Sequence, residues 1–331
     1  MGSATGRRGR RVGPCERRDT ARSRRTDRGR HVELIALGTD VVSSTEPCLA
    51  DDQRRRTTRG APVTQSPQIP SVEPDLVGVR NFRDVGGLPT GDGRRIRHGV
   101  LFRSGHLAGA TPEDTAFLDS LGLHTVFDFR NSADIKLEGR DVALTGVRNV
   151  NIPLSDPADG SGFWTMVREG ELRELRELLA EGRAAGRMIA SYREIVTTRT
   201  VEHGRLLAEL AGGSSPALLH CSAGKDRAGL SIAVILLALG VERDAIEQDY
   251  LESGAAHRRY KIWRSGDPAN AMAPEVIELL TPLFDARLEY LTAAWDTIDS
   301  VWGGVERYLT QGLGLTDQMR ESLRERLLVS F

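Results

Sequence analysis

The sequence predicts an α/β fold in which helices flank a mostly parallel central sheet. Short apolar segments typical of strands occur near residues 100, 126, 149 and 218. Patterns typical of helices separate these segments, and this alternation indicates a layered fold with parallel strands. Arg103 follows the first segment, Asp128 and Arg130 lie near the end of the second, and Cys221 follows the fourth. Because ligands of such sheets bind beyond the carboxyl ends of the strands, we expect the functional site there.

The composition narrows the class of protein. The 331 residues carry a formal net charge of −1, so bulk electrostatics give no reason to expect a nucleic-acid partner. Three cysteines, Cys15, Cys48 and Cys221, are too few for a disulfide framework and fit a reducing compartment. No apolar run reaches the roughly 18 residues of a membrane span. No apolar stretch follows the N-terminal charges, so we expect a cytoplasmic protein, or one exported without a visible signal peptide.

The first 70 residues differ from the rest of the chain. Residues 1–30 contain eleven arginines and three acidic residues, and the whole stretch is rich in Gly, Thr, Ser and Pro. This composition predicts a disordered tail over residues 1–70 and a catalytic domain over 71–331. An arm that binds nucleic acid or membranes is the alternative, although no aromatic residue interleaves these arginines.

The predicted domain opens with a hairpin and its following strand. Paired glycines in residues 81–87 indicate a loop or bulge, and the Gly-Asp-Gly sequence at 91–93 indicates a tight turn. Residues 85–102 therefore form a predicted hairpin. Its last strand, residues 99–102, delivers Arg103 to the strand end.

A helix and two strands come next. Thr111 is a predicted N-cap because Pro112 and two acidic residues follow it, and the helix stops at Gly122. Residues 124–130 and 147–152 are the second and third predicted strands.

Most of the remaining chain is predicted to be helical. Residues 171–179 repeat Glu, Leu and Arg, which are strong helix formers, within a helical insertion that has an exposed charged face. One long amphipathic helix is expected over residues 187–211. Four further helices are predicted at 243–252, 275–291, 292–301 and 316–328.

The stretch with the clearest chemistry is the loop at residues 220–229. An apolar run at 216–219 reads as a buried strand, and the apolar segment 230–240 with its terminal glycine reads as a buried helix. Cys221 therefore stands at the end of a strand, and the loop enters a helix N-terminus.

This loop has the right length to hold one phosphate-sized anion. Five residues separate Cys221 from Arg227, and the backbone of such a loop can curl its N–H groups around the anion. The helix N-terminus adds partial positive charge, and the guanidinium of Arg227 matches two phosphate oxygens. The same positive field favours the thiolate of Cys221, which is the reactive form. The candidate contacts to the anion along the loop are Ser222, Ala223, Gly224 and Lys225.

The motif His-Cys-x-x-Gly-Lys-Asp-Arg-x-Gly at 220–229 resembles the signature of the cysteine-dependent protein tyrosine phosphatases. Its Lys-Asp pair resembles the bacterial branch with tyrosine and phosphoinositide phosphatase activity, the mycobacterial secreted-effector type. Segments 81–87, 101–105 and 127–130 are similar to other landmarks of that branch in the same order. The resemblance covers residues 72–330, and the loop is its specific part.

The resemblance implies a phosphatase-like fold and a phosphomonoesterase that acts on phosphotyrosine proteins or phosphoinositides. It also implies a thiolate nucleophile, a phosphocysteine intermediate, no metal ion or other cofactor, and a two-helix lid over the site. The insertion at about 158–186 is the candidate lid.

Each candidate residue has an ordinary structural alternative. Cys221 could be a buried core thiol and Arg227 a surface ion-pair partner, but their spacing in a strand–loop–helix setting favours a nucleophile and a phosphate binder. His220 is expected to hold the loop and tune the thiolate. Lys225 is either a second basic contact for polyanionic substrates or a solvated loop residue.

Asp226 and Asp128 compete for the role of general acid. Asp226 lies in the loop beside the expected position of the leaving oxygen, and it is the favoured candidate. Asp128 ends a neighbouring strand, and its alternative role is an ion pair with Arg103 or Arg130.

One position departs from the family pattern. The family usually has Ser or Thr directly after the loop arginine, where the hydroxyl stabilises the leaving thiolate, and this chain has Ala228. A catalytically impaired module that binds phospho-ligands therefore stays open. A rhodanese-like sulfurtransferase is a second alternative, because that class of enzyme also has a cysteine in an anion-binding loop. The Lys-Asp-Arg-x-Gly ending and the helical insertion argue against the sulfurtransferase.

Overall fold

The computed structural model describes residue 74 and residues 76–157, 161–169, 172–260 and 272–330. The described residues belong to one compact unit, Pro67–Phe331. The predicted tail over residues 1–70 lies outside the described residues, as do parts of the predicted lid. Among the described residues no helix is long and apolar enough to cross a membrane.

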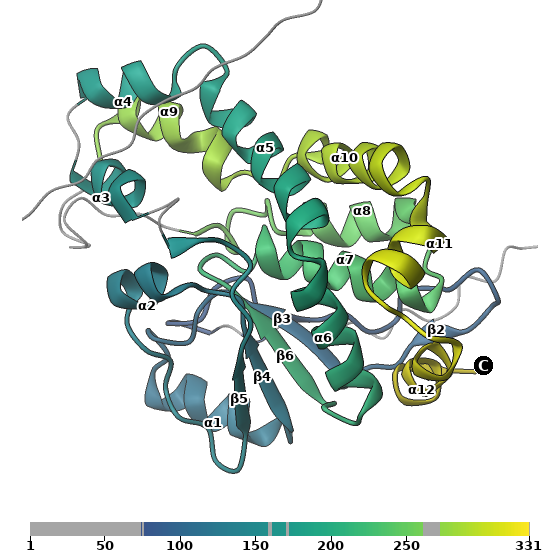
Figure 1. Ribbon diagram of the computed structural model, residues 1–331. Helices are drawn as coiled ribbons and strands as arrows, with labels where there is room; N and C mark the ends of the chain where they lie inside the picture. Colours follow the sequence, from purple (N-terminus) through teal and green to yellow (C-terminus); the bar gives the residue numbers. More distant parts are fainter. Residues whose placement is uncertain (1–73, 75, 158–160, 170–171, 261–271, 331) are drawn as a thin grey trace, which may run out of the picture. The chain divides into compact units, whose positions relative to one another are not determined.

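A five-stranded mixed sheet forms the centre of this unit, with the strand order β1-β3-β6-β4-β5 (Figure 1). Strands β3, β6, β4 and β5 pair in parallel, and β1 pairs antiparallel with β3. The bounds are β1 Arg83–Asp84, β3 Leu101–Ser104, β4 Thr125–Asp128, β5 Arg148–Asn151 and β6 Ala217–His220. The predicted fold class and its four strands are confirmed.

The predicted hairpin is also confirmed. Arg83 lies opposite Arg103, and the ladder continues outward through the bridge between Pro89 and Arg95. Its outer strand β2 (Arg95–Ile96) pairs antiparallel with β7 (Leu328–Val329) at the other end of the chain. The sequence pattern did not reveal β7, because two residues carry no period.

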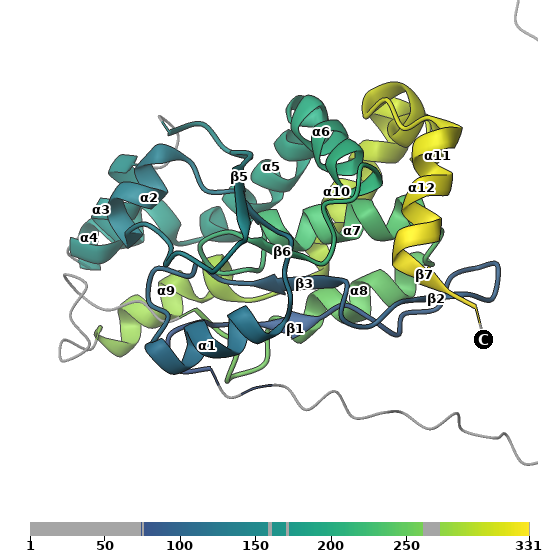
Figure 2. The ribbon, with the colours of Figure 1, turned by 90° about the horizontal axis from the view of Figure 1, so that it is seen from below.

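Alternate residues of the strands face two different cores, as the pleat of a sheet requires. Phe102, Val126 and Leu218 face α1 (Pro112–Ser120) in one hydrophobic cluster. Leu101, Phe127 and Leu219 belong to the larger cluster on the opposite face, where α6 (Thr200–Ala211), α7 (Arg227–Leu239) and α12 (Asp317–Leu327) pack. Figure 2 shows α1 and α7 on opposite sides of the sheet.

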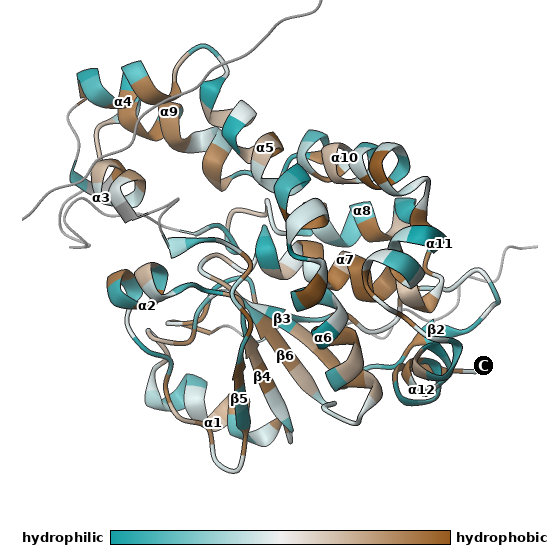
Figure 3. Ribbon diagram, in the orientation of Figure 1, coloured by the Kyte–Doolittle hydropathy of each residue, from teal (hydrophilic) through white to brown (hydrophobic). Residues whose placement is uncertain are grey.

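Helix α7 is the central helix of the unit. All of its residues after Arg227 are buried, and most are apolar (Figure 3). Gly240 ends it in the left-handed region with φ of 82°, as the predicted glycine stop requires. A helix buried on all sides fixes the place of its own N-terminus, and that N-terminus adjoins the loop at 220–229.

The predicted long helix at 187–211 is two helices, α5 (Arg183–Thr198) and α6, with a break at Arg199. Val196, Thr197 and Thr198 precede the break and are β-branched, which lowers helix propensity. The hydroxyls of both threonines donate to the carbonyl of Glu194, at 3.0 and 2.9 Å. Such bonds compete with the helix ladder and bend helices.

The predicted helix at 275–291 is also interrupted. Helix α9 (Pro274–Phe284) ends, residues 285–287 are partly extended, and α10 (Leu288–Thr297) follows. A π-helical turn, Ile298–Trp302, continues α10 toward the end of the predicted 292–301 helix. The predicted helices at 243–252 and 316–328 are confirmed as α8 (Arg243–Glu252) and α12. The other short elements are α2 Ser132–Glu138, α11 Val305–Arg307 and the π-helical turn Tyr308–Gly312.

The helical insertion contains α3 (Ser161–Glu169) and α4 (Leu172–Leu179). Val167 and Leu175 are buried in a third hydrophobic cluster with Leu280 and Leu283 of α9. Figure 1 shows α3, α4 and α9 grouped beyond the carboxyl ends of the strands. We call these three helices the lid group.

An ion network lies beneath the loop at 220–229. Arg103 has a fully buried side chain and places Nη1 2.7 Å from Asp249 Oδ2. Arg83 places Nε 2.9 Å from Asp249 Oδ1. Burial alone would raise the pKa of Asp249, but the two arginines lower it below its usual value. The ionised carboxylate is therefore the form that the fold stabilises.

Asp249→Asn should lower the free energy of unfolding by about 3–5 kcal/mol at pH 7, because two buried arginines lose their shared counter-charge. The difference in the free energy of unfolding between wild type and Asp249→Asn is fully present above the ordinary aspartate pKa of 3.8. It is lost as the pH falls through the lower pKa that Asp249 has in the folded state. Urea unfolding of both proteins at pH 7, 5 and 3 would measure this difference. A difference that stayed constant to pH 3 would contradict an ionised Asp249 as its source.

Candidate active site

The loop predicted from the sequence lies at the carboxyl end of β6. His220 is the last residue of that strand, Cys221 follows with 2% of its surface exposed, and α7 begins at Arg227. The structure therefore confirms the strand–loop–helix setting of Cys221.

The carbonyl groups of four consecutive loop residues are bound from outside the loop. His106 N–H donates to Ser222 O at 3.2 Å, and the Asn81 amide donates to Ala223 O at 3.2 Å. Arg103 Nη2 donates to Gly224 O at 2.8 Å and to Lys225 O at 3.2 Å. Of the three donors, Asn81 precedes β1, Arg103 lies within β3 and His106 follows β3.

These bonds decide which way the loop amides point. In a trans peptide the C=O and the N–H point in opposite directions. With the carbonyls of residues 222–225 held outward, the N–H groups of residues 223–226 turn to the concave side. Such a row of N–H groups at a helix N-terminus forms an anion-binding cradle. Four of the predicted contacts, Ser222 to Lys225, lie along this cradle.

Glycine is required at position 224. Its φ is +68°, and a Cβ there would lie 2.3 Å from the carbonyl of Ser104. The close approach of the loop to β3 thus depends on the missing side chain.

The guanidinium of Arg227 is held by three neighbouring side chains. Its Nη2 donates to Ser222 Oγ at 2.9 Å, and its Nη1 contacts Ser155 Oγ at 3.3 Å and the carboxylate of Asp134. Burial alone would lower the pKa of Arg227, but Asp134 and the nearby Cys221 raise it above the usual value. The guanidinium is therefore charged and fixed in orientation.

Sequence reasoning missed Asp134 and Ser155. Asp134 also accepts the Asn131 N–H in the capping box that begins α2. That Asn-x-x-Asp start was visible in the sequence, but only the fold brings α2 to Arg227.

His220 is fully buried among acidic residues. Its Nε2 lies 3.1 Å from Asp141 Oδ2, and its Nδ1 lies 3.8 Å from Asp128 Oδ1. Burial alone would raise the pKa of Asp141, but His220 and Arg130 lower it to about 2. These contacts hold the imidazole at the start of the loop, which fits the supporting role predicted for His220. Asp141 was not foreseen.

Asp128 forms an ion pair with Arg130. Its Oδ1 accepts from Arg130 Nε at 3.0 Å and its Oδ2 from Arg130 Nη2 at 3.0 Å. Asp128, Asp141 and His220 could by their spacing hold a cation. The guanidinium of Arg130, 2.7 Å from Asp141 Oδ2, already supplies positive charge to both carboxylates. This is the structural alternative that the sequence offered for Asp128.

Asp226 occupies different surroundings. Its Oδ1 accepts from the Tyr192 hydroxyl at 2.8 Å, and that hydroxyl lies 2.9 Å from the hydroxyl of Tyr250. Burial and the charge of Asp226 raise the pKa of Tyr192 well above its usual value, so the phenol stays a donor. The Asp226 side chain is 23% exposed, more than the 13% of Asp128.

Lys225 is not a solvated loop residue. Its side chain is 3% exposed, and its ammonium donates to the carbonyls of Leu283 and Asp285, each at 2.8 Å. The predicted contact between Lys225 and a polyanionic substrate stays untested by these positions.

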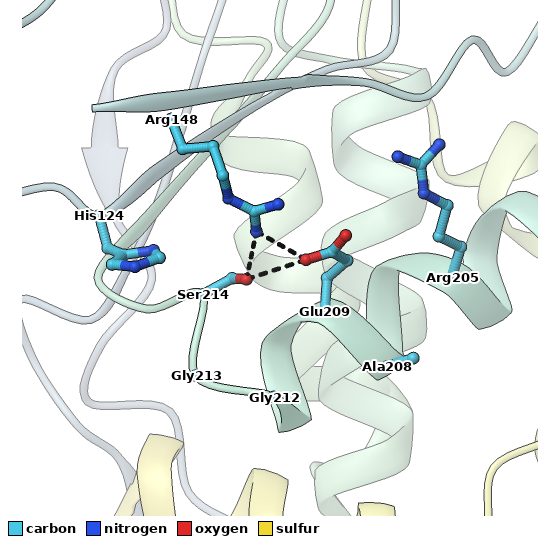
Figure 4. A pocket seen from close by; sticks show the side chains of 8 residues that line it. All are labelled: His124, Arg148, Arg205, Ala208, Glu209, Gly212, Gly213 and Ser214. Carbon is cyan, nitrogen blue, oxygen red and sulfur yellow. Dashed lines mark hydrogen bonds and ion pairs between the residues drawn. The ribbon is translucent and has the colours of Figure 1, made fainter. Parts of the chain in front are cut away.

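Two hollows lie at opposite ends of the sheet. One of about 510 Å³ adjoins Arg227 through Ser155, and Ile135, Ile152 and Pro153 are among its lining residues. The other, of about 410 Å³, lies by the amino ends of β5 and β6 (Figure 4). There Arg148 binds Glu209 at 2.6 Å and Ser214 at 2.7 Å, far along the strands from Cys221. Neither of these two hollows is lined by a residue of the loop at 220–229; the first adjoins the loop through Ser155, whose Oγ lies 3.3 Å from Arg227 Nη1.

Comparison with known proteins finds relatives of this chain. The model of the tyrosine phosphatase family matches residues 74–329. A Cupriavidus necator protein named as a tyrosine-protein phosphatase is 34% identical over 76% of this chain and 90% of its own length. The triple specificity protein phosphatase PtpB of Mycobacterium tuberculosis is 31% identical over 71% of this chain and 92% of its own. The solved structure of P. aeruginosa TpbA is 17% identical, covers 61% of this chain and 90% of that chain, and has a TM-score of 0.24.

Proposed function

Because the chain belongs to the tyrosine phosphatase family, we propose that it hydrolyses phosphotyrosine in proteins through a phosphocysteine formed on Cys221. The observation that carries this proposal is the loop itself. Its carbonyls are held outward, its N–H groups converge on one anion site, and Cys221 and Arg227 stand at its two ends. Positioned donors and a thiolate are what phosphoryl transfer to a nucleophile requires.

The first step is attack of the Cys221 thiolate on phosphorus. The Sγ–P bond forms as the bond between phosphorus and the tyrosine oxygen breaks. Arg227 and the N–H groups of residues 223–226 bind the phosphoryl oxygens, whose charge is spread over three positions in the transition state. Asp226 donates a proton to the leaving phenolate oxygen. Tyr192 fixes Oδ1 of Asp226, which leaves Oδ2 as the oxygen that carries the proton.

The second step releases phosphate. A water molecule attacks the phosphocysteine, Asp226 accepts one of its protons, and the S–P bond breaks. The electron pair of that bond returns to sulfur and regenerates the thiolate. Ala228 stands in the first turn of α7 with no exposed surface, and alanine cannot donate a hydrogen bond to the departing thiolate.

Phosphotyrosine is the favoured substrate class over phosphoinositides. The sequence argument for phosphoinositides had two parts: the resemblance of the Lys-Asp pair to the bacterial branch, and Lys225 as a second basic contact. The ammonium of Lys225 is directed to two backbone carbonyls, so this support is weaker than the support from the family. The mycobacterial relative is named as a triple specificity phosphatase, so substrates other than phosphotyrosine, phosphoinositides among them, belong in the test.

Cys221→Ser should lower turnover of a phosphotyrosine peptide by at least about a thousandfold, because a hydroxyl is a far weaker nucleophile than a thiolate. Phosphate release would be measured on phosphotyrosine peptide, phosphoserine peptide and a short-chain phosphatidylinositol phosphate. Binding of vanadate, measured by calorimetry, should persist because the cradle is intact. Wild-type enzyme that hydrolysed only the phosphoinositide would contradict the proposed substrate class, and an active Cys221→Ser would contradict the intermediate.

Asp226→Asn should distinguish substrates by their leaving groups. A general acid contributes about 10²–10⁴-fold when the leaving oxygen needs a proton. The loss should therefore be large with phenyl phosphate and small with p-nitrophenyl phosphate, whose phenolate leaves without one. Asp128→Asn is the matched variant. It should lower the rates with both substrates by the same factor, because it disturbs Arg130. If Asp128→Asn shows the leaving-group dependence instead, the two roles are exchanged.

Ala228→Thr should raise steady-state turnover. A hydrogen bond to the charged thiolate is worth ~1.5–3 kcal/mol, or about ten- to a hundredfold in the second step. Ala228→Val is the control, since valine has the shape of threonine without the hydroxyl. Rapid-mixing kinetics with an aryl phosphate should show a burst in the wild type that shrinks in Ala228→Thr. Equal rates for the threonine and valine variants would show that the second step does not limit turnover.

A further inference from the structure

We infer that the side chain of Lys225 positions the loop at 220–229 by tying it to the base of the lid group, and that this side chain does not contact the substrate. The inference rests on the proposed function, because the loop it positions is the one that would bind the phosphoryl group. Lys225 lies within the loop, between Cys221 and Arg227.

The ammonium of Lys225 has an acceptor for each of its three N–H groups. It donates to Leu283 O and Asp285 O at 2.8 Å, and Asp226 Oδ1 lies 3.3 Å away. An ammonium has three donors and no acceptor. A swing toward a substrate would break these bonds and leave a buried carbonyl unsatisfied, which is costly. The side chain is thus committed to the protein.

The acceptors exist because α9 ends where it does. The last carbonyls of a helix have no partner within that helix. Lys225 binds two carbonyls at this end, and the Tyr290 hydroxyl donates to a third, Pro282 O, at 2.7 Å. The Tyr290 ring centroid lies 5.8 Å from the Lys225 ammonium and adds a cation–π contact.

The same end of α9 holds the lid group together. Leu283 is buried in the cluster with Val167 and Leu175 of the insertion. The adjacent Phe284 has its ring centroid 6.1 Å from that of Trp164 in α3. A displacement of the end of α9 would therefore reach α3 and α4 through packed side chains.

Lys225 is also held at its backbone. Its carbonyl accepts from Arg103, which is anchored in the buried ion network below the loop. One residue thus joins the fixed floor of the site through its main chain and the lid group through its side chain. If the contacts of the Lys225 side chain are lost, we expect both the lid group and the anion-binding cradle to become more mobile.

Two variants of Lys225 distinguish the effect of its hydrogen-bond donors from the effect of its positive charge. Lys225→Met keeps an unbranched side chain but donates nothing, and Lys225→Gln is neutral but keeps two N–H donors. Arg307→Met, at an exposed site on α11, is the control for loss of one positive charge. We expect kcat/KM of Lys225→Met to fall about ten- to a hundredfold, because small displacements of catalytic groups have such effects. The fall should be equal for phosphotyrosine peptide and phosphatidylinositol phosphate, and Lys225→Gln should recover part of it.

Hydrogen exchange provides a readout independent of activity. Amides of α9 and α4 should exchange faster in Lys225→Met than in Arg307→Met, with Lys225→Gln between them. A selective loss of phosphoinositide activity, with glutamine as poor as methionine and exchange unchanged in α9, would overturn the inference and make Lys225 a substrate contact. If Lys225→Met does not fold, Lys225→Gln is compared with the wild type instead. The same two measurements, the loss of activity with each substrate and the amide exchange in α9, then test the inference. A wild type without phosphatase activity would refute the proposed function, while the exchange measurement would still test the tie.

Discussion

The arrangement of the site depends on one constraint: four consecutive carbonyls of the loop at 220–229 are held away from its centre. A loop free to rotate its peptides would present a mixture of C=O and N–H groups to an anion. Here His106, Asn81 and Arg103 bind those carbonyls from outside, and the N–H groups of residues 223–226 are left facing inward. The cradle is preorganised by bonds on its outer surface, so the anion need not order it.

Buried charges maintain this arrangement. Arg103 serves the loop only because Asp249 neutralises it, and Asp249 is in turn shared with Arg83. On the other side of the loop, Asp134 orients Arg227, and Asp141 with Arg130 encloses His220. Each of these buried ions has a partner of opposite charge, which is the condition for its presence in an interior of low polarity. Removing one partner would leave the other charged and unpaired.

The helical insertion packs on the rest of the unit through a hydrophobic cluster formed by its described residues. Its α3 and α4 pack on α9, and the end of α9 meets Lys225. A satellite cluster of this kind is less stable than the main core, so contacts at its base influence its order strongly. The loop and the insertion are far apart in the sequence, and the contact between Lys225 and the end of α9 links them in the fold.

The sequence by itself determined the strands, the layered class and the loop at 220–229, because these depend on local periodicity and on spacing within ten residues. It also predicted Cys221 and Arg227 as the ends of one anion site. The tertiary structure alone decided what surrounds them. Asp134, Asp141 and Asp249 are ordinary acids in the sequence, and they become partners of Arg227, His220 and Arg103 only across large separations along the chain. The end of α9 is of the same kind, because the partner of its last carbonyls is a buried ammonium from a loop far away along the chain.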